Sequence, residues 1–318
     1  MHHKLRFYIV GQPSSLKSEI CFSEGQLIRI ELQGGLGNQL FIWAMAHHLE
    51  SHFDEHVRIV YPLSKNGRSD RPCEIAGLIQ LCEHDVSILE SKYLGHATKL
   101  IDKLNSIKFL KKIINLNRIG IFTANFSSEV KIEYKKSPRL VRGYFQNTEI
   151  VQSLSDQILQ ELNAYLQSIS LPASVNIRGV KLVAHIRRGD TKTISQEFGV
   201  LSLDYYKQKI ESSSNVVICT DEQSDLEKFY REFPRALIIT PTESNPWQTL
   251  KILSSTEKLI MANSTLSWWA AWIAKQLGNS EVIFPFPWRP TQSEENHALL
   301  MGNVAFANSI FEKSDKEA

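Results

Sequence analysis

The sequence lacks the features that would place the chain outside the cytoplasm. It holds only four cysteines, with no CxxC pair and no zinc-type spacing, so neither a disulfide framework nor a zinc site is indicated. No apolar run reaches the roughly 20 residues of a membrane-spanning helix. The first residues contain no apolar core long enough for a secretory signal. These absences predict a cytoplasmic protein with reduced thiols.

The sequence also lacks a large excess of positive or negative charge and the usual metal-binding patterns. Lys and Arg total 36 against 34 Asp and Glu, so no overall field favours nucleic acid, and any phosphate site must be built locally. No D-x-D triplet occurs, and His47, His48 and Glu50 do not follow the order of an H-E-x-x-H zinc helix. We therefore predict a small ligand and no metal.

The second half of the chain alternates short β-branched runs with helical patterns, which predicts a parallel sheet covered on both faces. The expected strands are 181–187, 215–220, 236–240, 258–262 and 281–285. The expected helices are 203–212, 222–232, 246–254 and 265–277. In such sheets a ligand binds beyond the carboxyl ends of the strands. A Rossmann-like domain over residues 176–318 is the prediction.

The first half is less regular. Its expected elements, in chain order, are a strand over 26–32, a glycine turn, a helix over 39–53, a strand over 57–61 and a helix over 149–169. We predict an extension over residues 1–25 and an α/β domain over 26–175. Residues 99–118 form a basic, amphipathic helical pattern, and two interpretations stay open: peripheral contact with an anionic membrane surface, or packing on its own domain.

The segment His185-Ile186-Arg187-Arg188-Gly189-Asp190 follows a buried strand and indicates a diphosphate site. Arginine presents a planar fork of donors that matches phosphate oxygens in pairs. The alternative is an internal salt bridge between arginine and Asp190, with His185 satisfied in the core. Asp190 would either orient an arginine or accept a proton from an attacking hydroxyl. The residue types alone leave both roles open.

The turn Gly34-Gly35-Leu36-Gly37-Asn38 resembles a dinucleotide fingerprint, but Leu40 stands where the third glycine belongs, which disfavours NAD or FAD. Asn38 is either a helix cap or a side chain that points at a ligand.

Residues 263–267, Asn-Ser-Thr-Leu-Ser, gather hydroxyl and amide groups where a strand passes into a helix, a pattern typical of phosphate binding and of a plain helix cap. Asp221 ends another strand and would bond a ribose or cap the next helix. In the helix after residue 264, Trp268 and Trp272 either pack or line a sugar-binding surface.

Three segments taken together, 34–39, 185–190 and 263–269, resemble the α-1,2-fucosyltransferases, especially the bacterial enzymes of surface-polysaccharide synthesis. Residues 143–146, 204–206 and 287–288 look like the same family. Each segment alone is weak evidence, but the three in order at suitable spacing are specific. The likeness runs from about residue 28 to about residue 290.

This resemblance implies an α/β protein of GT-B type, with two Rossmann-like domains that face a cleft and an irregular N-terminal one. It implies inverting transfer of L-fucose from GDP-β-L-fucose to the 2-hydroxyl of a galactose residue in a glycan, free or lipid-linked, as in O-antigen synthesis. No metal and no cofactor would take part. The implied catalytic residues are Asn38, Arg187 and Asp190. The implied donor-binding residues are Gly37, His185, Arg188, Asp221, Asn263, Ser264, Thr265 and Ser267.

Three alternatives stay open at this point: a fucosyltransferase of another linkage, a transferase of another GDP-sugar, and a nucleotide-sugar-binding protein without turnover.

Overall fold

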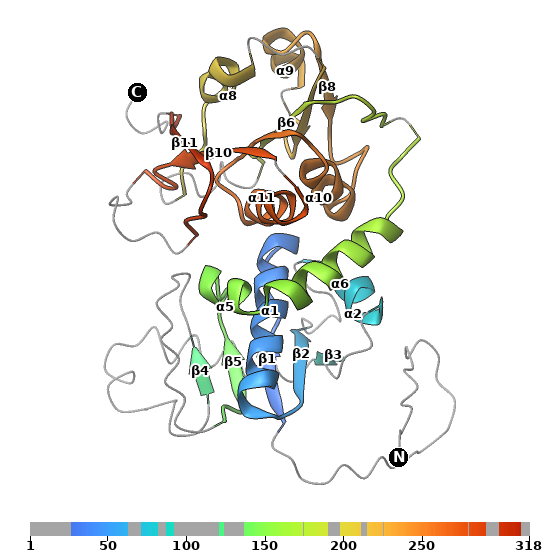
Figure 1. The fold of residues 1–318 in the computed structure, drawn as a ribbon, viewed down its shortest axis with the longest axis vertical. Coiled ribbons are helices and arrows are strands. Elements are labelled where there is room, and N and C mark those ends of the chain that lie inside the picture. The colour runs from blue at the N-terminus through green and yellow to red at the C-terminus, as the bar shows by residue number, and fades with distance from the viewer. Residues whose placement is uncertain are drawn as a thin grey trace.

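The computed structural model describes residues 27–62, 71–81, 87–91, 121–123, 137–173, 175–189, 198–210, 215–224, 226–278, 280–290 and 299–312. The expectations for residues 1–25, for residues 99–118 and for Asp190 lie outside these ranges. Two parallel sheets form the molecule, one in each half (Figure 1). This arrangement confirms the predicted α/β class with two Rossmann-like units. No helix among the described residues has the length and apolar character to span a membrane.

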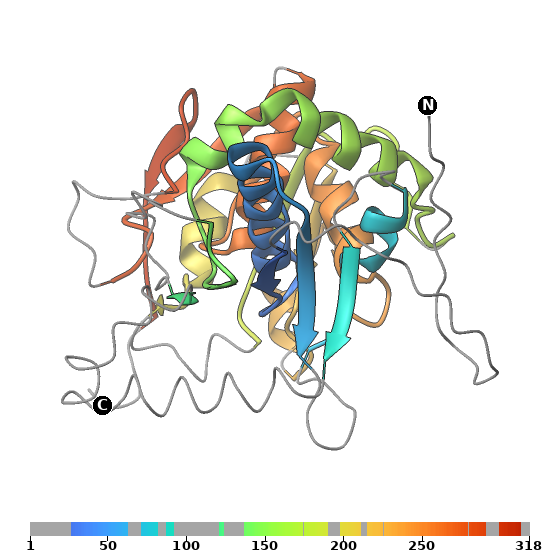
Figure 2. The same cartoon turned by 90° about the horizontal axis from the view of Figure 1, so that it is seen from below.

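The lower sheet in Figure 1 has the strand order β3-β2-β1-β5-β4. Its strands are β1 (Ile28–Glu31), β2 (Val57–Pro62), β3 (Ser87–Ser91), β4 (Ile121–Thr123) and β5 (Leu140–Arg142). Its helices are α1 (Leu36–Phe53), α2 (Ala76–Leu81), α5 (Thr148–Ser153) and α6 (Ser155–Ser168). β2 and β3 run side by side in one direction, as the view from below shows (Figure 2). The chain order reverses at β1, which pairs with both β2 and β5.

The upper sheet has the order β11-β10-β9-β6-β7-β8. Its strands are β6 (Leu182–Ile186), β7 (Val216–Thr220), β8 (Ala236–Ile239), β9 (Lys258–Ile260), β10 (Glu281–Phe286) and β11 (Ala305–Asn308). From β6 the chain first builds outwards through β7 to β8, and then returns to the other side of β6 with β9. This is the doubly wound order, and its switch point lies between β6 and β9.

Helices cover both faces of the upper sheet, because alternate residues of a buried strand point to opposite sides. On β6, Val183 packs into the core that contains α10 (Pro246–Ser254) and α11 (Thr265–Leu277). Leu182 and Ala184 pack into a second core with α8 (Leu203–Ile210) and α9 (Leu226–Glu232).

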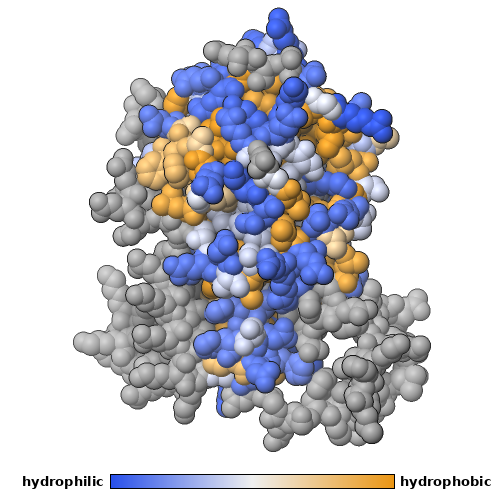
Figure 3. All heavy atoms as spheres, viewed as in Figure 1, coloured by the Kyte–Doolittle hydropathy of each residue, from blue (hydrophilic) through white to orange (hydrophobic). Residues whose placement is uncertain are grey.

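The first of these cores runs through both halves of the molecule. α1 of the lower half packs against α11, and the rings of Phe41 and Trp268 lie 4.9 Å apart. Trp247 of α10 donates from Nε1 to the carbonyl of Glu74 over 2.7 Å. The predicted boundary between the two domains, near residue 175, stays a prediction. In the chain it comes after the last strand of the lower sheet and before the first strand of the upper sheet. On the face seen in Figure 3, the described part of the lower half is mainly hydrophilic, whereas hydrophobic residues show between hydrophilic ones over the upper half.

Three predicted helices differ in extent. α1 begins at Leu36 rather than at residue 39, so Gly37 and Asn38 lie inside its first turn. The predicted helix over 149–169 is broken at Leu154 into α5 and α6. The helix predicted from residue 222 begins at Leu226, because the Glu222 side chain accepts hydrogen bonds from the backbone and hydroxyl of Ser224 and forms a turn instead.

Candidate active site

The switch point of the upper sheet brings two of the predicted segments to one edge. Arg187 follows β6 directly, and Ser264 and Thr265 follow the neighbouring strand β9 at the start of α11. Carboxyl ends of neighbouring parallel strands meet at the same edge of a sheet. The guanidinium of Arg187 therefore shares this edge with the positive end of the α11 dipole, a combination that favours an anion.

Asp221, at the end of β7, holds the turn that carries Arg187. Its Oδ1 accepts hydrogen bonds from the backbone N–H groups of Arg188, over 2.6 Å, and Gly189, over 2.9 Å. Its Oδ2 lies 3.4 Å from Nε of Arg187, whose side chain is 27% exposed. A Cβ on Gly189 would lie 3.0 Å from the carbonyl oxygen and from Oδ2 of Asp221, so a larger residue here would press against Asp221. Asp221 thus orients the arginine turn, a role that differs from the expected contact with the nucleoside.

Arg188 does not point where Arg187 points. Its guanidinium forms a two-pronged pair with Glu312, with distances of 2.5 and 3.1 Å, and its Nε lies 3.6 Å from Oε2 of Glu222. The side chain is buried. Two carboxylates thus engage this arginine, so the structure does not bring it to the predicted donor cradle. Arg188 is thus held in internal ion pairs with Glu312 and Glu222, whereas the expected salt bridge with Asp190 lies outside the described residues.

His185 lies beneath the arginine turn rather than in the cradle. Its Nδ1 and the Ser267 hydroxyl are 2.6 Å apart, and that hydroxyl also accepts the N–H of Ala262 over 3.1 Å. Burial lowers the pKa of His185 to about 4, and the charge of Arg187 acts in the same direction against the opposing effect of Asp221. The ring is therefore neutral near pH 7 and supplies no charge to a phosphate. It connects β6 to the start of α11, and the expected donor contacts of His185 and Ser267 stay predictions.

The other residues at the start of α11 divide into two groups. Asn263 is buried and donates from Nδ2 to the carbonyls of Phe198, Gly199 and Trp288, so it anchors two loops, and its contact with the donor stays a prediction. Ser264 is the helix cap, and its hydroxyl accepts the N–H of Ser267 over 3.2 Å. Ser264 and Thr265 are half-buried. They are the two predicted phosphate-binding hydroxyls that stay partly accessible at this edge.

Asn38 stands at the switch point of the lower sheet. The cap of α1 is Gly35, so the interpretation of Asn38 as a helix cap is wrong. Its Oδ1 accepts a hydrogen bond from Nε2 of Gln146 over 3.0 Å. A Cβ on Gly34, whose φ is +75°, would lie 2.6 Å from Asn38 Nδ2 and 3.1 Å from the ring of Tyr144. The glycine turn and the segment after β5 therefore fix the direction of the Asn38 amide.

Gly37 is a close contact between the two halves. Its carbonyl accepts a hydrogen bond from Nε1 of Trp269 over 2.9 Å. A Cβ added to it would lie 2.5 Å from the backbone nitrogen of Leu266 and 2.6 Å from the Thr265 hydroxyl. Gly37 is thus required for packing α1 against the start of α11, and this contact differs from the donor contact that was expected. It places the Asn38 turn beside Thr265.

Two predictions are not decided by the described residues. Asp190 lies outside them, so its role as base or as an orienting group stays a prediction. Among the residues that the structure describes, no group of three or more His, Cys, Asp or Glu side chains is placed to hold a metal ion. The absence of a metal from the reaction likewise stays a prediction.

Three residues of this network were not predicted as site residues from the sequence: Gln146, Glu222 and Glu312. Glu312 is 124 residues from its partner Arg188, and Gln146 is 108 residues from Asn38. Their residue types alone give no signal at such separations. Gly189 lies inside the predicted segment 185–190, and a glycine directly after two arginines at a strand end indicates a tight turn.

Two bacterial transferases and one solved fucosyltransferase structure are similar to this chain. The O-antigen biosynthesis glycosyltransferase WbnK of Escherichia coli is 24% identical over 285 residues, which cover 81% of this chain and 93% of that protein. An α-1,2-colitosyltransferase of Escherichia coli is 24% identical over 291 residues, 82% of this chain and 92% of the relative. Among solved structures, the fucosyltransferase NodZ from Bradyrhizobium aligns with a TM-score of 0.44 at 11% identity, over 78% of this chain and 93% of that one.

The family assignment rests on a match to most of the chain. The model of glycosyl transferase family 11 matches residues 27–300, a segment that contains Asn38, Arg187 and the start of α11. The match confirms the family that the three motifs predict. The chain belongs to glycosyl transferase family 11 and is a glycosyltransferase.

Proposed function

We propose that this glycosyltransferase transfers L-fucose from GDP-β-L-fucose to the 2-hydroxyl of a galactose residue in a surface glycan such as an O-antigen, with inversion and without a metal. The observation that carries this proposal is Arg187. It stands at the β6–β9 switch point, is held by Asp221, and lies at the same edge as Ser264 and Thr265. This arrangement suits the diphosphate of a nucleotide sugar.

The chemistry follows from the charges. As the bond between the anomeric carbon and the diphosphate breaks, the carbon gains positive character and the diphosphate gains negative charge. Arg187 and the α11 dipole would stabilise that developing charge in place. Inversion requires the acceptor hydroxyl on the opposite face of the sugar. Asn38 follows Gly37, the residue of the lower half that meets Thr265, and we assign Asn38 the positioning of the reacting groups. Asp190 is proposed as the base.

Family membership and relatives support the glycan part of the proposal. The relative WbnK is named an O-antigen glycosyltransferase. A second candidate function is transfer of colitose, which is L-fucose without its 3-hydroxyl, because an equally similar relative is named an α-1,2-colitosyltransferase. Both sugars would leave the same GDP, so the diphosphate site alone does not separate them.

A donor comparison tests the proposal. The purified chain is incubated with GDP-β-L-fucose, GDP-colitose or GDP-mannose and a set of free and lipid-linked β-galactosides, and the linkage of each product is determined by NMR. We expect an α-1,2-linked fucosyl product, and slow release of fucose from GDP-fucose without acceptor. Turnover of GDP-colitose alone would favour the second candidate, another linkage would refute the 2-hydroxyl assignment, and tight GDP-fucose binding with neither hydrolysis nor transfer would indicate a binding protein.

A further inference from the structure

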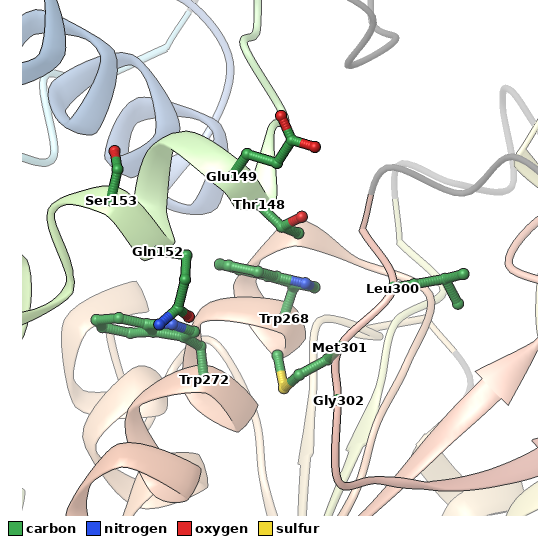
Figure 4. Close-up of a pocket in the computed structure, with 9 residues that line it drawn as sticks. All are labelled: Thr148, Glu149, Gln152, Ser153, Trp268, Trp272, Leu300, Met301 and Gly302. Carbon is green, nitrogen blue, oxygen red and sulfur yellow. The ribbon is translucent and has the colours of Figure 1, made fainter.

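A cavity of about 510 Å³ lies between the two halves, outside the network around Arg187. α5 of the lower half forms one wall, and α11 and the segment before β11 form the other (Figure 4). Its lining residues are Thr148, Glu149, Gln152, Ser153, Trp268, Trp272, Leu300, Met301 and Gly302. The volume is in the lower part of the range of about 300–1,000 Å³ that is usual for small-molecule sites.

Two lining residues of the cavity lie close in the chain to residues of the candidate active site. Thr148 comes two residues after Gln146, the partner of Asn38. Trp268 comes three residues after Thr265 on α11, which corresponds to about 4.5 Å along the helix axis. A chain of linked sugars whose terminal residue reaches the centre between Asn38 and Thr265 would therefore continue into this cavity.

The chemistry of the lining selects the class of ligand. No lysine, arginine or histidine is among the lining residues, and the single charged one is Glu149. Such a wall disfavours a phosphate and is compatible with a neutral ligand. Thr148 and Gln152 project from α5 toward the two indoles (Figure 4). An apolar floor beneath hydroxyl and amide groups matches a sugar ring, which has C–H faces and a rim of hydroxyls.

The floor is rigid before any ligand binds. Trp268 is 1% exposed and donates from Nε1 to the carbonyl of Leu299 over 2.9 Å, and Trp272 is 4% exposed. The packing interpretation of both tryptophans is thus correct for most of each ring, and only their edges face the cavity. Gln152, Glu149 and Leu300 at the rim are exposed. Recognition would therefore depend on the rim hydrogen bonds and on the shape of the floor.

We propose that this cavity binds the acceptor sugar residue that precedes the galactose to be fucosylated. The assignment rests on the proposed function, because it takes the terminal galactose to lie at the reacting centre. It makes this cavity the part of the site that distinguishes a disaccharide acceptor from a single galactoside.

Filling the cavity tests the assignment. Gly302 is exposed and lines the cavity, and a Cβ there meets no atom within 4 Å, so Gly302→Leu adds bulk at the rim of the cavity without strain. Gly278→Leu, at another open position, is the matched control. We expect Gly302→Leu to lower kcat/KM for a β-galactosyl disaccharide roughly tenfold, with little change for methyl β-galactoside. Gln152→Ala should give a loss of roughly twofold to tenfold, the effect of one hydrogen bond, and Gln160→Ala on α6 should give none.

Saturation-transfer NMR with the same disaccharide makes the result independent of the donor. The cavity assignment is supported if both sugar rings give signals with the wild type and with Gly278→Leu and the signals weaken with Gly302→Leu. This result would stand even if GDP-fucose were not turned over. In that case only the proposed donor would be refuted. Transfer from GDP-fucose with an unchanged preference for the disaccharide in both Gly302→Leu and Gln152→Ala would overturn the cavity assignment alone.

Discussion

Replacing Arg187 by alanine is expected to lower the rate of fucosyl transfer by about 10²-fold or more. The expected size is that of losing one oxyanion donor from an active site, because Arg187 would meet charge that develops only as the diphosphate leaves. The loss should appear in kcat as well as in kcat/KM for GDP-fucose. Arg187→Lys keeps the charge without the planar fork, so we expect an intermediate rate.

Controls separate this effect from damage to the fold. Arg187 is partly exposed and its ion pair with Asp221 is long, at 3.4 Å, so the alanine variant should unfold at nearly the wild-type temperature. Arg178→Ala removes an arginine from an exposed position away from the strand ends and should leave the rate unchanged. Turnover of Arg187→Ala near the wild-type rate would remove the residue from the mechanism.

Replacing Gly37 by alanine should destabilise the contact between the two halves. The added methyl would lie 2.5 Å from the nitrogen of Leu266 and 2.6 Å from the carbonyl carbon of Thr265. Both are backbone atoms, so relief requires α1 and α11 to move apart. We expect a loss of about 1–3 kcal/mol in the free energy of unfolding, the usual effect of overpacking, together with a fall in transfer rate as Asn38 moves away from Thr265.

Gly35 provides the matched control. It is two residues away and an added Cβ there meets no atom within 4 Å. It caps α1, where exchange of glycine for alanine costs less than about 1 kcal/mol. Urea unfolding of Gly37→Ala and Gly35→Ala measures both effects. Equal stability of the two variants would contradict the role of Gly37 as the contact point.

The sequence pattern predicted those features of the structure that are determined within a single strand, turn or helix. The alternation of strands and helices after residue 181 placed Arg187, Ser264 and Thr265 beyond the carboxyl ends of strands, and the structure adds that these strands are neighbours. The glycine turn likewise placed Asn38 at the start of α1. In each case the signal lies within one strand, turn or helix.

Residue types could not predict which partner each charged side chain takes. Arg187 and Arg188 are adjacent and chemically identical, yet Asp221 holds one at the switch point while Glu312 and Glu222 draw the other into the interior. The assignment depends on β7 and on the segment after β11, which meet the arginine turn only in the folded chain. Short strands such as β5, with three residues, were missed because so brief a run shows no clear period.

In the proposed mechanism, Arg187 and the start of α11 take the place of a metal ion while GDP departs. The most direct test is the initial rate of transfer from GDP-β-L-fucose to a β-galactoside in excess EDTA, compared with the rate after Mg²⁺ or Mn²⁺ is supplied in excess of the chelator. We predict equal rates. Loss of transfer in EDTA that either metal restores would contradict the claim.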